Sequence, residues 1–142
     1  MCVLLGSDRF TLEETPDLTG KVAVVTGGAQ GIGYGAVHTF LKKNISKVYI
    51  ISVSEDVIEG AKKDVADGLS AELAERMHWI KCDLADWAAV TGVAKQITES
   101  TDRIDILFNN SSRGIMTYQL TDYGVDRHMA VVGDSPLSSK CL

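Results

Sequence analysis

The chain has 142 residues, of which 45% are hydrophobic and 23% charged, and its formal net charge is −5. These values are typical of one globular domain with a single core, and they leave no room for a second domain of ordinary size. The acidic balance argues against nucleic acid or an anionic membrane surface as the main partner. Two prolines in the whole chain argue against a disordered or linker-like protein.

The cysteines and the apolar runs indicate the cellular compartment in which we expect the protein. Cys2, Cys82 and Cys141 are odd in number and widely separated, which excludes a disulfide framework, and no cysteine–histidine cluster has metal-ligand spacing. The apolar stretch before Asp8 is too short for a signal peptide, and the run 48–53 is too short to span a bilayer. We therefore expect a cytoplasmic protein with reduced thiols, without a metal and without a membrane partner.

The first half of the chain alternates between strand and helix patterns. A β-branched run at 21–25, bounded by glycines, predicts a buried strand. Apolar residues then recur at helical spacing from 32 to about 44, and a second strand is expected at 48–51. The charged segment 55–77 is expected to form a helix that breaks near Gly68.

The second half continues the alternation. A third strand is expected at 78–82, followed by a helix that Asp86 caps and whose apolar face begins at Trp87. A fourth strand is expected at 104–108, and a short helix near 122–131. The order β-α-β-α-β-α-β predicts an α/β fold with a parallel sheet and crossover helices.

A glycine-rich turn lies where the first predicted strand meets the first predicted helix, in the segment Thr-Gly-Gly-Ala-Gln-Gly-Ile-Gly at 26–33. Glycines there permit a sharp turn and let backbone N–H groups approach a pyrophosphate at the helix N-terminus. A P-loop is excluded, because Ile32, Gly33 and Tyr34 stand where it needs Gly-Lys-Ser/Thr. The usual G-x-G-x-x-G spacing is not met either. The position of the turn favours nucleotide binding over a bare turn.

The glycine spacing, with Thr26 before it and Ile32 inside it, resembles that of the short-chain dehydrogenase/reductase family of NAD(P)-dependent oxidoreductases. The pair Asp83-Leu84 resembles the family's acidic residue that contacts adenine. The run 109–112, Asn-Asn-Ser-Ser, resembles the Asn-Asn-Ala-Gly element that closes the fourth strand. The resemblance implies a Rossmann-type three-layer α/β/α fold with a parallel sheet that is incomplete, at about four strands. It also implies these cofactor-binding residues: Thr26, Gly27, Gln30, Gly31, Ile32, Gly33, Ser52, Asp83, Leu84, Asn109 and Asn110.

Each of these residues also has a purely structural interpretation. Thr26 can be a strand-end hydroxyl that satisfies the turn, and Asp83 can be a solvated loop acid. Asn109 and Asn110 are ordinary turn residues in most proteins. The order and spacing of the three motifs favour the ligand-binding interpretation. The aromatic residues Tyr49, Trp79 and Trp87 are expected in or beside the core, without a functional role.

The choice between NAD and NADP stays open in the sequence. An acid at the end of the second strand binds the ribose 2′-hydroxyl of NAD, whereas an arginine there suits the 2′-phosphate of NADP. The chain has Ser52, Val53 and Ser54 at this place, followed by Glu55. A serine serves either group, so we expect NADP or NAD with a slight preference for NADP. A small-molecule substrate is implied for the family, and its identity is unknown.

The family's catalytic pair, Tyr-x-x-x-Lys, is absent from the 142 residues. The four tyrosines are followed four positions later by other residues: Tyr34 by His38, Tyr49 by Val53, Tyr118 by Asp122, and Tyr123 by Arg127. An arginine cannot be deprotonated as a lysine can, so it is no substitute. We therefore assign no catalytic residue and expect no turnover from this chain.

The resemblance runs from about Leu18 to Val131 and departs from the family near Val132. It divides the chain into an N-terminal arm at 1–18, a nucleotide-binding half-domain at 19–131 and a divergent polar tail at 132–142. A truncated family member is the first hypothesis. In it, the strand at 104–108 becomes a sheet edge, which invites self-association. The second hypothesis is a non-catalytic nucleotide-binding or interaction module that pairs with a partner through the exposed edge, with completion of the sheet by the partner chain as a special case.

Overall fold

The computed structural model describes residues 11–112, 114 and 117–132. Most of the expected arm at 1–18 and nearly all of the expected tail at 132–142 lie outside these residues, as do Cys2 and Cys141. A short 3-10 helix at Leu12–Glu14 precedes the α/β region. The strands are β1 (Val22–Thr26), β2 (Lys47–Ser52), β3 (Met77–Lys81) and β4 (Ile106–Asn109), and the helices are α1 (Gly31–Lys42), α2 (Glu55–Gly68), α3 (Ala71–Glu75), α4 (Trp87–Ser100) and α5 (Arg127–Val132).

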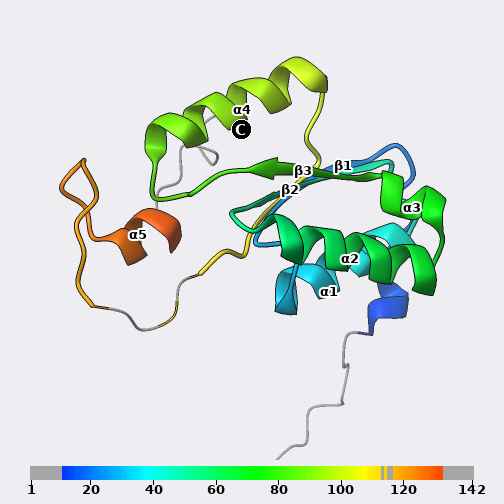
Figure 1. The fold of residues 1–142 in the computed structure, drawn as a ribbon. Helices are drawn as coiled ribbons and strands as arrows, with labels where there is room; N and C mark the ends of the chain where they lie inside the picture. The colour runs from blue at the N-terminus through cyan, green and yellow to red at the C-terminus, as the bar shows by residue number, and fades with distance from the viewer. Residues whose placement is uncertain (1–10, 113, 115–116, 133–142) are drawn as a thin grey trace, which may run out of the picture.

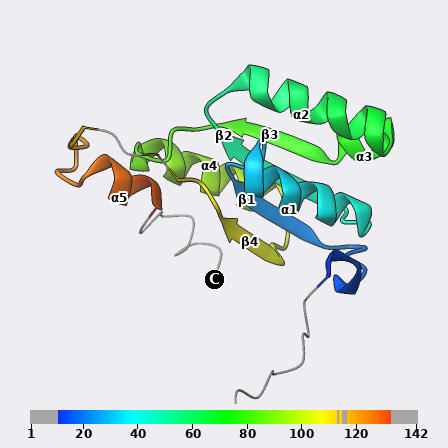
Figure 2. The same ribbon diagram turned by 90° about the horizontal axis from the view of Figure 1, so that it is seen from below.

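The four strands form one parallel sheet in the order β3-β2-β1-β4. Helices α1 and α2 cover one face and α4 covers the other, which gives three layers (Figures 1 and 2). The Rossmann-type α/β/α expectation is confirmed, and each predicted strand is present with bounds shifted by one or two residues. No helix in the described ranges is long and apolar enough to cross a bilayer.

Strand β1 lies at the centre of the core, because all five of its residues are buried. Alternate side chains of a strand point to opposite faces, so a doubly covered strand is apolar throughout. Ala23 and Val25 join the cluster that contains Val37 of α1. Val24 joins the cluster that contains Ile97 of α4. Tyr49 is buried as expected, at 5% exposure, whereas Trp79 and Trp87 are half-buried.

The helix signals in the sequence act as predicted at two places. Asp86 caps α4, and its carboxylate accepts a hydrogen bond from the Ala89 backbone N–H at 3.0 Å. The helix expected at 55–77 breaks after Gly68, and α3 starts behind Ser70, whose hydroxyl accepts from the Leu73 N–H at 3.2 Å.

The short helix expected near 122–131 starts later, at Arg127. Gly124 adopts a φ of 75°, and its N–H bonds back to the Thr121 carbonyl at 2.9 Å. This left-handed residue turns the chain before the helix can begin. The expected start at 122 is therefore wrong by five residues.

Strand β4 lies at the edge of the sheet in the described part of the chain, as predicted. It pairs with β1 along Ala23↔Ile106 to Thr26↔Asn109. Its residues are half-buried or exposed, in contrast to the fully buried β1. An apolar edge strand of this kind presents unpaired backbone groups.

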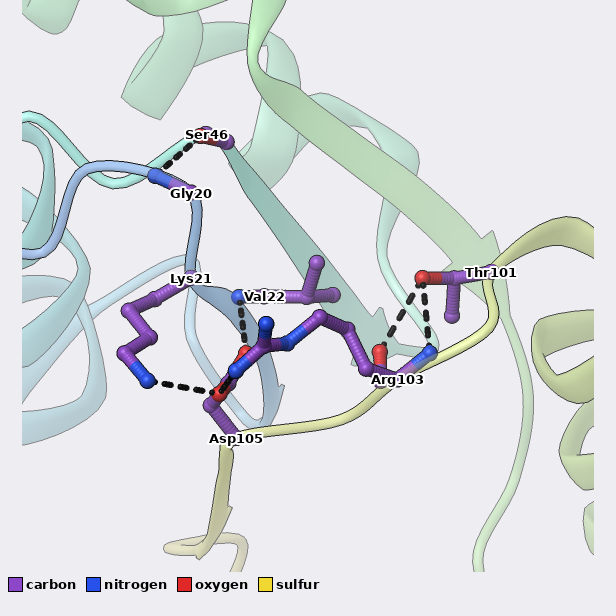
Figure 3. Close-up of polar contacts among 7 residues, drawn as sticks. All are labelled: Gly20, Lys21, Val22, Ser46, Thr101, Arg103 and Asp105. Atoms are coloured by element: carbon purple, nitrogen blue, oxygen red, sulfur yellow. Dashed lines mark hydrogen bonds and ion pairs between the residues drawn. The ribbon is translucent and has the colours of Figure 1, made fainter.

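Asp105, just before β4, ties the start of β4 to the start of β1 (Figure 3). Its carboxylate accepts the Val22 backbone N–H at 3.0 Å and the Lys21 ammonium at 3.0 Å. The Arg103 guanidinium donates to both carboxylate oxygens. Hydrogen bonds from the Arg103 side chain, and then from the Val22 backbone, hold the pKa of Asp105 well below its usual range.

Substitution D105N is expected to lower thermal stability in a pH-dependent way. Because the folded-state pKa is depressed, the carboxylate contributes stability above its unfolded pKa of about 3.9, and this contribution is lost as pH falls. Melting temperatures of wild type and D105N should therefore differ most at about pH 6, and the difference should begin to shrink as the pH falls below about 4, towards about pH 3. The control D102N changes an exposed acid in the same loop and should melt like wild type. A constant difference across this pH range would contradict the assignment.

Candidate functional site

A cleft with a volume of about 750 Å³ lies at the carboxyl ends of the four strands. Small-molecule sites commonly have roughly 300–1,000 Å³. In open parallel sheets ligands bind at this edge, where the strand order reverses, here between β1 and β4. Eight of the eleven predicted binding residues line the cleft: Gly27, Gln30, Gly31, Ile32, Ser52, Asp83, Leu84 and Asn110.

Thr26, the last residue of β1, does not line the cleft but holds its geometry. Its side chain is 2% exposed, and its hydroxyl oxygen accepts from the backbone N–H groups of Asn110 and Ser111, both at 3.0 Å. In return, the Asn110 side-chain amide donates to the carbonyls of Thr26 at 3.2 Å and Gly27 at 3.3 Å. The Thr26 side chain therefore acts as the strand-end hydroxyl that satisfies backbone groups, which is the structural interpretation given in the sequence analysis.

The glycine turn is compact because α1 begins inside it, at Gly31. Gly27 and Gly31 have φ values of 65° and 56°, which side-chain-bearing residues rarely adopt. Gly33 does not line the cleft. A Cβ there would collide with the Gly27 carbonyl oxygen and the Asn110 amide. Gly33 thus allows the first turn of α1 to lie against the end of β4.

The N-terminus of α1 offers unused backbone donors. Gln30 is its N-cap residue, and its side chain makes no capping hydrogen bond. The first N–H groups of a helix have no partner within the helix and carry its positive dipole end. Ile32, in the first turn, is 81% exposed, so this end of the helix is open to the cleft.

Ser52 ends β2 and lies in the cleft with its hydroxyl oxygen accepting from the Trp79 indole N–H at 2.9 Å. The residues that follow, Val53 and Ser54, also line the cleft. No carboxylate among the described lining residues comes from this end of β2.

Asp83 lies two residues after the end of β3, and both of its carboxylate oxygens have partners in the protein. One oxygen accepts the Ala85 backbone N–H at 2.9 Å, and the other forms an ion pair with the Arg127 guanidinium of α5. Both charged residues line the cleft, next to Leu84. Burial raises the pKa of the neighbouring Cys82 thiol to about 11, so this thiol stays protonated at neutral pH and is a poor nucleophile.

Arg127 is a cleft residue that the sequence did not predict, since it was considered there only as a poor substitute for a catalytic lysine. Arg127 and Val131 stand four residues apart on one face of α5, and the sequence alone does not place that face at the cleft. Both residues line the cleft. The structure leaves Asn109 outside the cleft lining, as an exposed residue at the end of β4.

Substitution G33A is expected to destabilise the protein by about 1–3 kcal/mol, because the added methyl group must displace backbone at the crossing of β1, α1 and β4. The matched control is G35A, further along α1, where a Cβ meets no atom within 4 Å. That change should stabilise the helix by about 0.5–1 kcal/mol. Urea unfolding measures both. Equal effects of the two substitutions would contradict the close approach at Gly33.

Comparison with known proteins gives a consistent result. The family model described as short chain dehydrogenase matches residues 21–137. The chain is 55% identical over 140 residues to the mitochondrial oxidoreductase bli-4 of Neurospora crassa, covering 97% of this chain and 34% of that protein. It is 36% identical over 126 residues to the short chain dehydrogenase/reductase dpchH of Colletotrichum higginsianum, covering 89% and 31%. The chain thus spans about a third of the length of the curated relatives it matches.

Solved structures match the fold. A short-chain dehydrogenase/reductase variant of Serratia marcescens has a TM-score of 0.68 and 29% identity, covering 88% of this chain and 51% of that one. The RhlG/NADP active-site complex of Pseudomonas aeruginosa has a TM-score of 0.55 and 26% identity, covering 68% and 36%. The Neurospora relative is named as a mitochondrial protein, which does not agree with the expected cytoplasmic location, and that location stays a prediction.

Proposed function

This chain belongs to the short-chain dehydrogenase family, and on that premise we propose that its cleft binds the adenosine and pyrophosphate part of NAD(P). The observation that carries the proposal is the position of the glycine turn. It opens α1 at the carboxyl edge of the sheet, next to the end of β4 and inside the cleft. This is the place where a pyrophosphate meets both free N–H groups and a helix dipole.

The pyrophosphate is assigned to the start of α1. Gly31 and Ile32 supply backbone N–H groups, and the free side chain of Gln30 supplies a further donor. Gly27 carries no side chain, which leaves room for Ser111 and the Asn110 amide beside the turn. These donors are uncharged, so the helix dipole and the hydrogen bonds together provide the attraction for the phosphates.

The adenine is assigned to the other end of the cleft. The Asp83 carboxylate accepts hydrogen bonds, which suits an adenine amino group, and Leu84 lies beside it in the lining. Arg127 pairs with Asp83 and keeps its planar guanidinium in the cleft. A guanidinium plane stacks well on an aromatic ring.

NADP is the favoured cofactor. The cleft residues at the end of β2 are Ser52, Val53 and Ser54, and none of them is an acid that would repel a 2′-phosphate. The similar RhlG structure of Pseudomonas aeruginosa is a complex with NADP, which supports this choice. A bound NADP supplies the hydride-transfer chemistry. The residues of this chain bind and orient it.

The activity proposed for a longer protein of this family is hydride transfer between an alcohol and a ketone of unknown identity. For the 142-residue chain we propose cofactor binding without turnover, because it lacks the Tyr-x-x-x-Lys pair. A second candidate function is an interaction module completed by a partner chain. The observation that favours it is the apolar edge strand β4.

Isothermal titration of the purified chain is expected to show binding of NADPH and weaker binding of NADH, with no nicotinamide oxidation on a panel of aldehydes and ketones. Substitution D83N should weaken NADPH about tenfold or more, because it removes a charged hydrogen-bond acceptor. The control D67N changes an exposed acid of α2. Absence of binding to both nucleotides would overturn the proposed site, and measurable turnover would overturn the proposed inactivity.

The chain is expected to self-associate through β4. Strand β4 has the sequence Ile-Leu-Phe-Asn, whereas the opposite edge strand β3 carries the exposed Lys81, and a charge on an edge discourages pairing. Sedimentation should therefore show concentration-dependent dimers or larger species. Hydrogen exchange should slow in β4 as the concentration rises and should not slow in β3, which serves as the internal control. A monomer at all concentrations would contradict this expectation.

A further inference from the structure

Two serines, Ser111 and Ser112, stand where the Asn-Asn-Ala-Gly element of the family has alanine and glycine, and the proposed function gives them no role. Both line the cleft, just after the end of β4. Ser111 is half-buried, whereas Ser112 is exposed. Within the part of the chain that the structure describes, the Ser111 hydroxyl makes no hydrogen bond. A half-buried hydroxyl that lines a cleft and lacks a protein partner is available to a ligand.

The backbone of Ser111 is held in place by β1. Its N–H donates to the buried Thr26 hydroxyl at 3.0 Å, beside the bond that the Asn110 N–H makes to the same oxygen. The Asn110 side-chain amide is already engaged, because it donates to the carbonyls of Thr26 and Gly27. The loop after β4 therefore carries the Ser111 side chain on a fixed backbone. A side chain positioned in this way loses little conformational freedom when it binds a ligand.

The Ser111 hydroxyl lies against the glycine turn. A Cβ added to Gly27 would stand only 2.9 Å from the Ser111 Oγ, so this hydroxyl crowds the space that a side chain at Gly27 would need. Gly27 in turn lies against the first turn of α1, since a Cβ added to Gly33 would collide with the Gly27 carbonyl oxygen. The Ser111 hydroxyl therefore stands close to the point where the N-terminus of α1 opens into the cleft.

The sheet topology places a ligand between these two segments. Strands β1 and β4 are neighbours, and the strand order reverses between them. A ligand at such a switch point lies between the turn that follows one strand and the loop that follows the other. The N–H groups of Gly31 and Ile32 stand on the side of the turn, and the Ser111 hydroxyl stands on the side of the loop.

From this geometry we infer that Ser111 is a further binding residue of the cleft, whose hydroxyl donates a hydrogen bond to the pyrophosphate from the side of β4. Phosphate oxygens are acceptors, and a hydroxyl can turn its hydrogen toward them. The negative charge of the phosphate strengthens such a bond. The inference rests on the proposed function, since it requires that the cleft binds the dinucleotide.

The test is S111A in the full chain, with Kd measured by ligand-observed NMR titration for NADPH, ADP and adenosine. ADP carries the diphosphate of the dinucleotide, whereas adenosine carries no phosphate. Substitution S111A should weaken the binding of NADPH and of ADP about tenfold, the loss expected for one hydrogen bond to a charged group, and should leave adenosine binding unchanged. The matched control is T91A, which removes a hydroxyl from an exposed position of α4 outside the cleft lining. It should leave the Kd of each ligand unchanged.

The outcomes separate the two proposals. If the wild-type chain binds neither NADPH nor ADP, the proposed function fails together with this inference. If it binds them and S111A leaves the Kd of ADP unchanged, or weakens ADP and adenosine equally, the inference fails and the proposed function stands. Circular dichroism checks that S111A folds. If it does not fold, S111G, which also lacks the hydroxyl, must show the selective loss of ADP binding, and an unchanged Kd for ADP overturns the inference.

Discussion

The buried hydroxyl of Thr26 is the acceptor on which the geometry of the cleft depends. It receives two backbone N–H groups from the loop after β4, and the Asn110 amide returns two bonds to the glycine turn. Thr26 and Asn110 lie 84 positions apart in the chain. Because leaving a buried N–H without a partner costs about 1–3 kcal/mol, the turn and the loop hold one relative position. The open end of α1 and the end of β4 therefore face the same cleft.

The opposite ends of the same two strands are tied by Asp105, whose carboxylate binds the Val22 N–H. The β1–β4 pair is thus closed by side chain–backbone bonds at both ends, although β4 is an edge strand with half-buried side chains. A slip of one residue would turn every β4 side chain to the wrong face and would break both ties together. Polar bonds at the strand ends supply register specificity that the modest burial of β4 does not.

Helices and strands could be predicted from the sequence where the apolar residues follow one clear helical or strand spacing. The errors in their bounds have local causes. Strand β4 starts at Ile106 rather than at 104, because the Val22 N–H, which a longer strand would pair with a backbone carbonyl, is bound by the Asp105 carboxylate. The start of α5 was predicted too early, because Gly124 adopts the left-handed backbone conformation and the helix begins only after this turn, although the apolar pattern starts before it. The family resemblance identified eight residues of the cleft, but a motif does not tell whether a polar group faces a ligand or a neighbour, as with Thr26. The Asp83–Arg127 pair joins residues 44 apart, and only the fold brings them together.

The polar groups of the cleft fall into two sets with different consequences. Thr26 and the Asn110 amide are engaged within the protein, so the frame of the cleft is already assembled in the structure. The N–H groups of α1 and the Ser52 hydroxyl keep donor capacity on the cleft side. A preassembled frame with free donors loses little conformational entropy when an anionic ligand binds. Both kinds of donor in this second set come from α1 and from the end of β2, so their attraction for an anionic ligand lies on that side of the cleft.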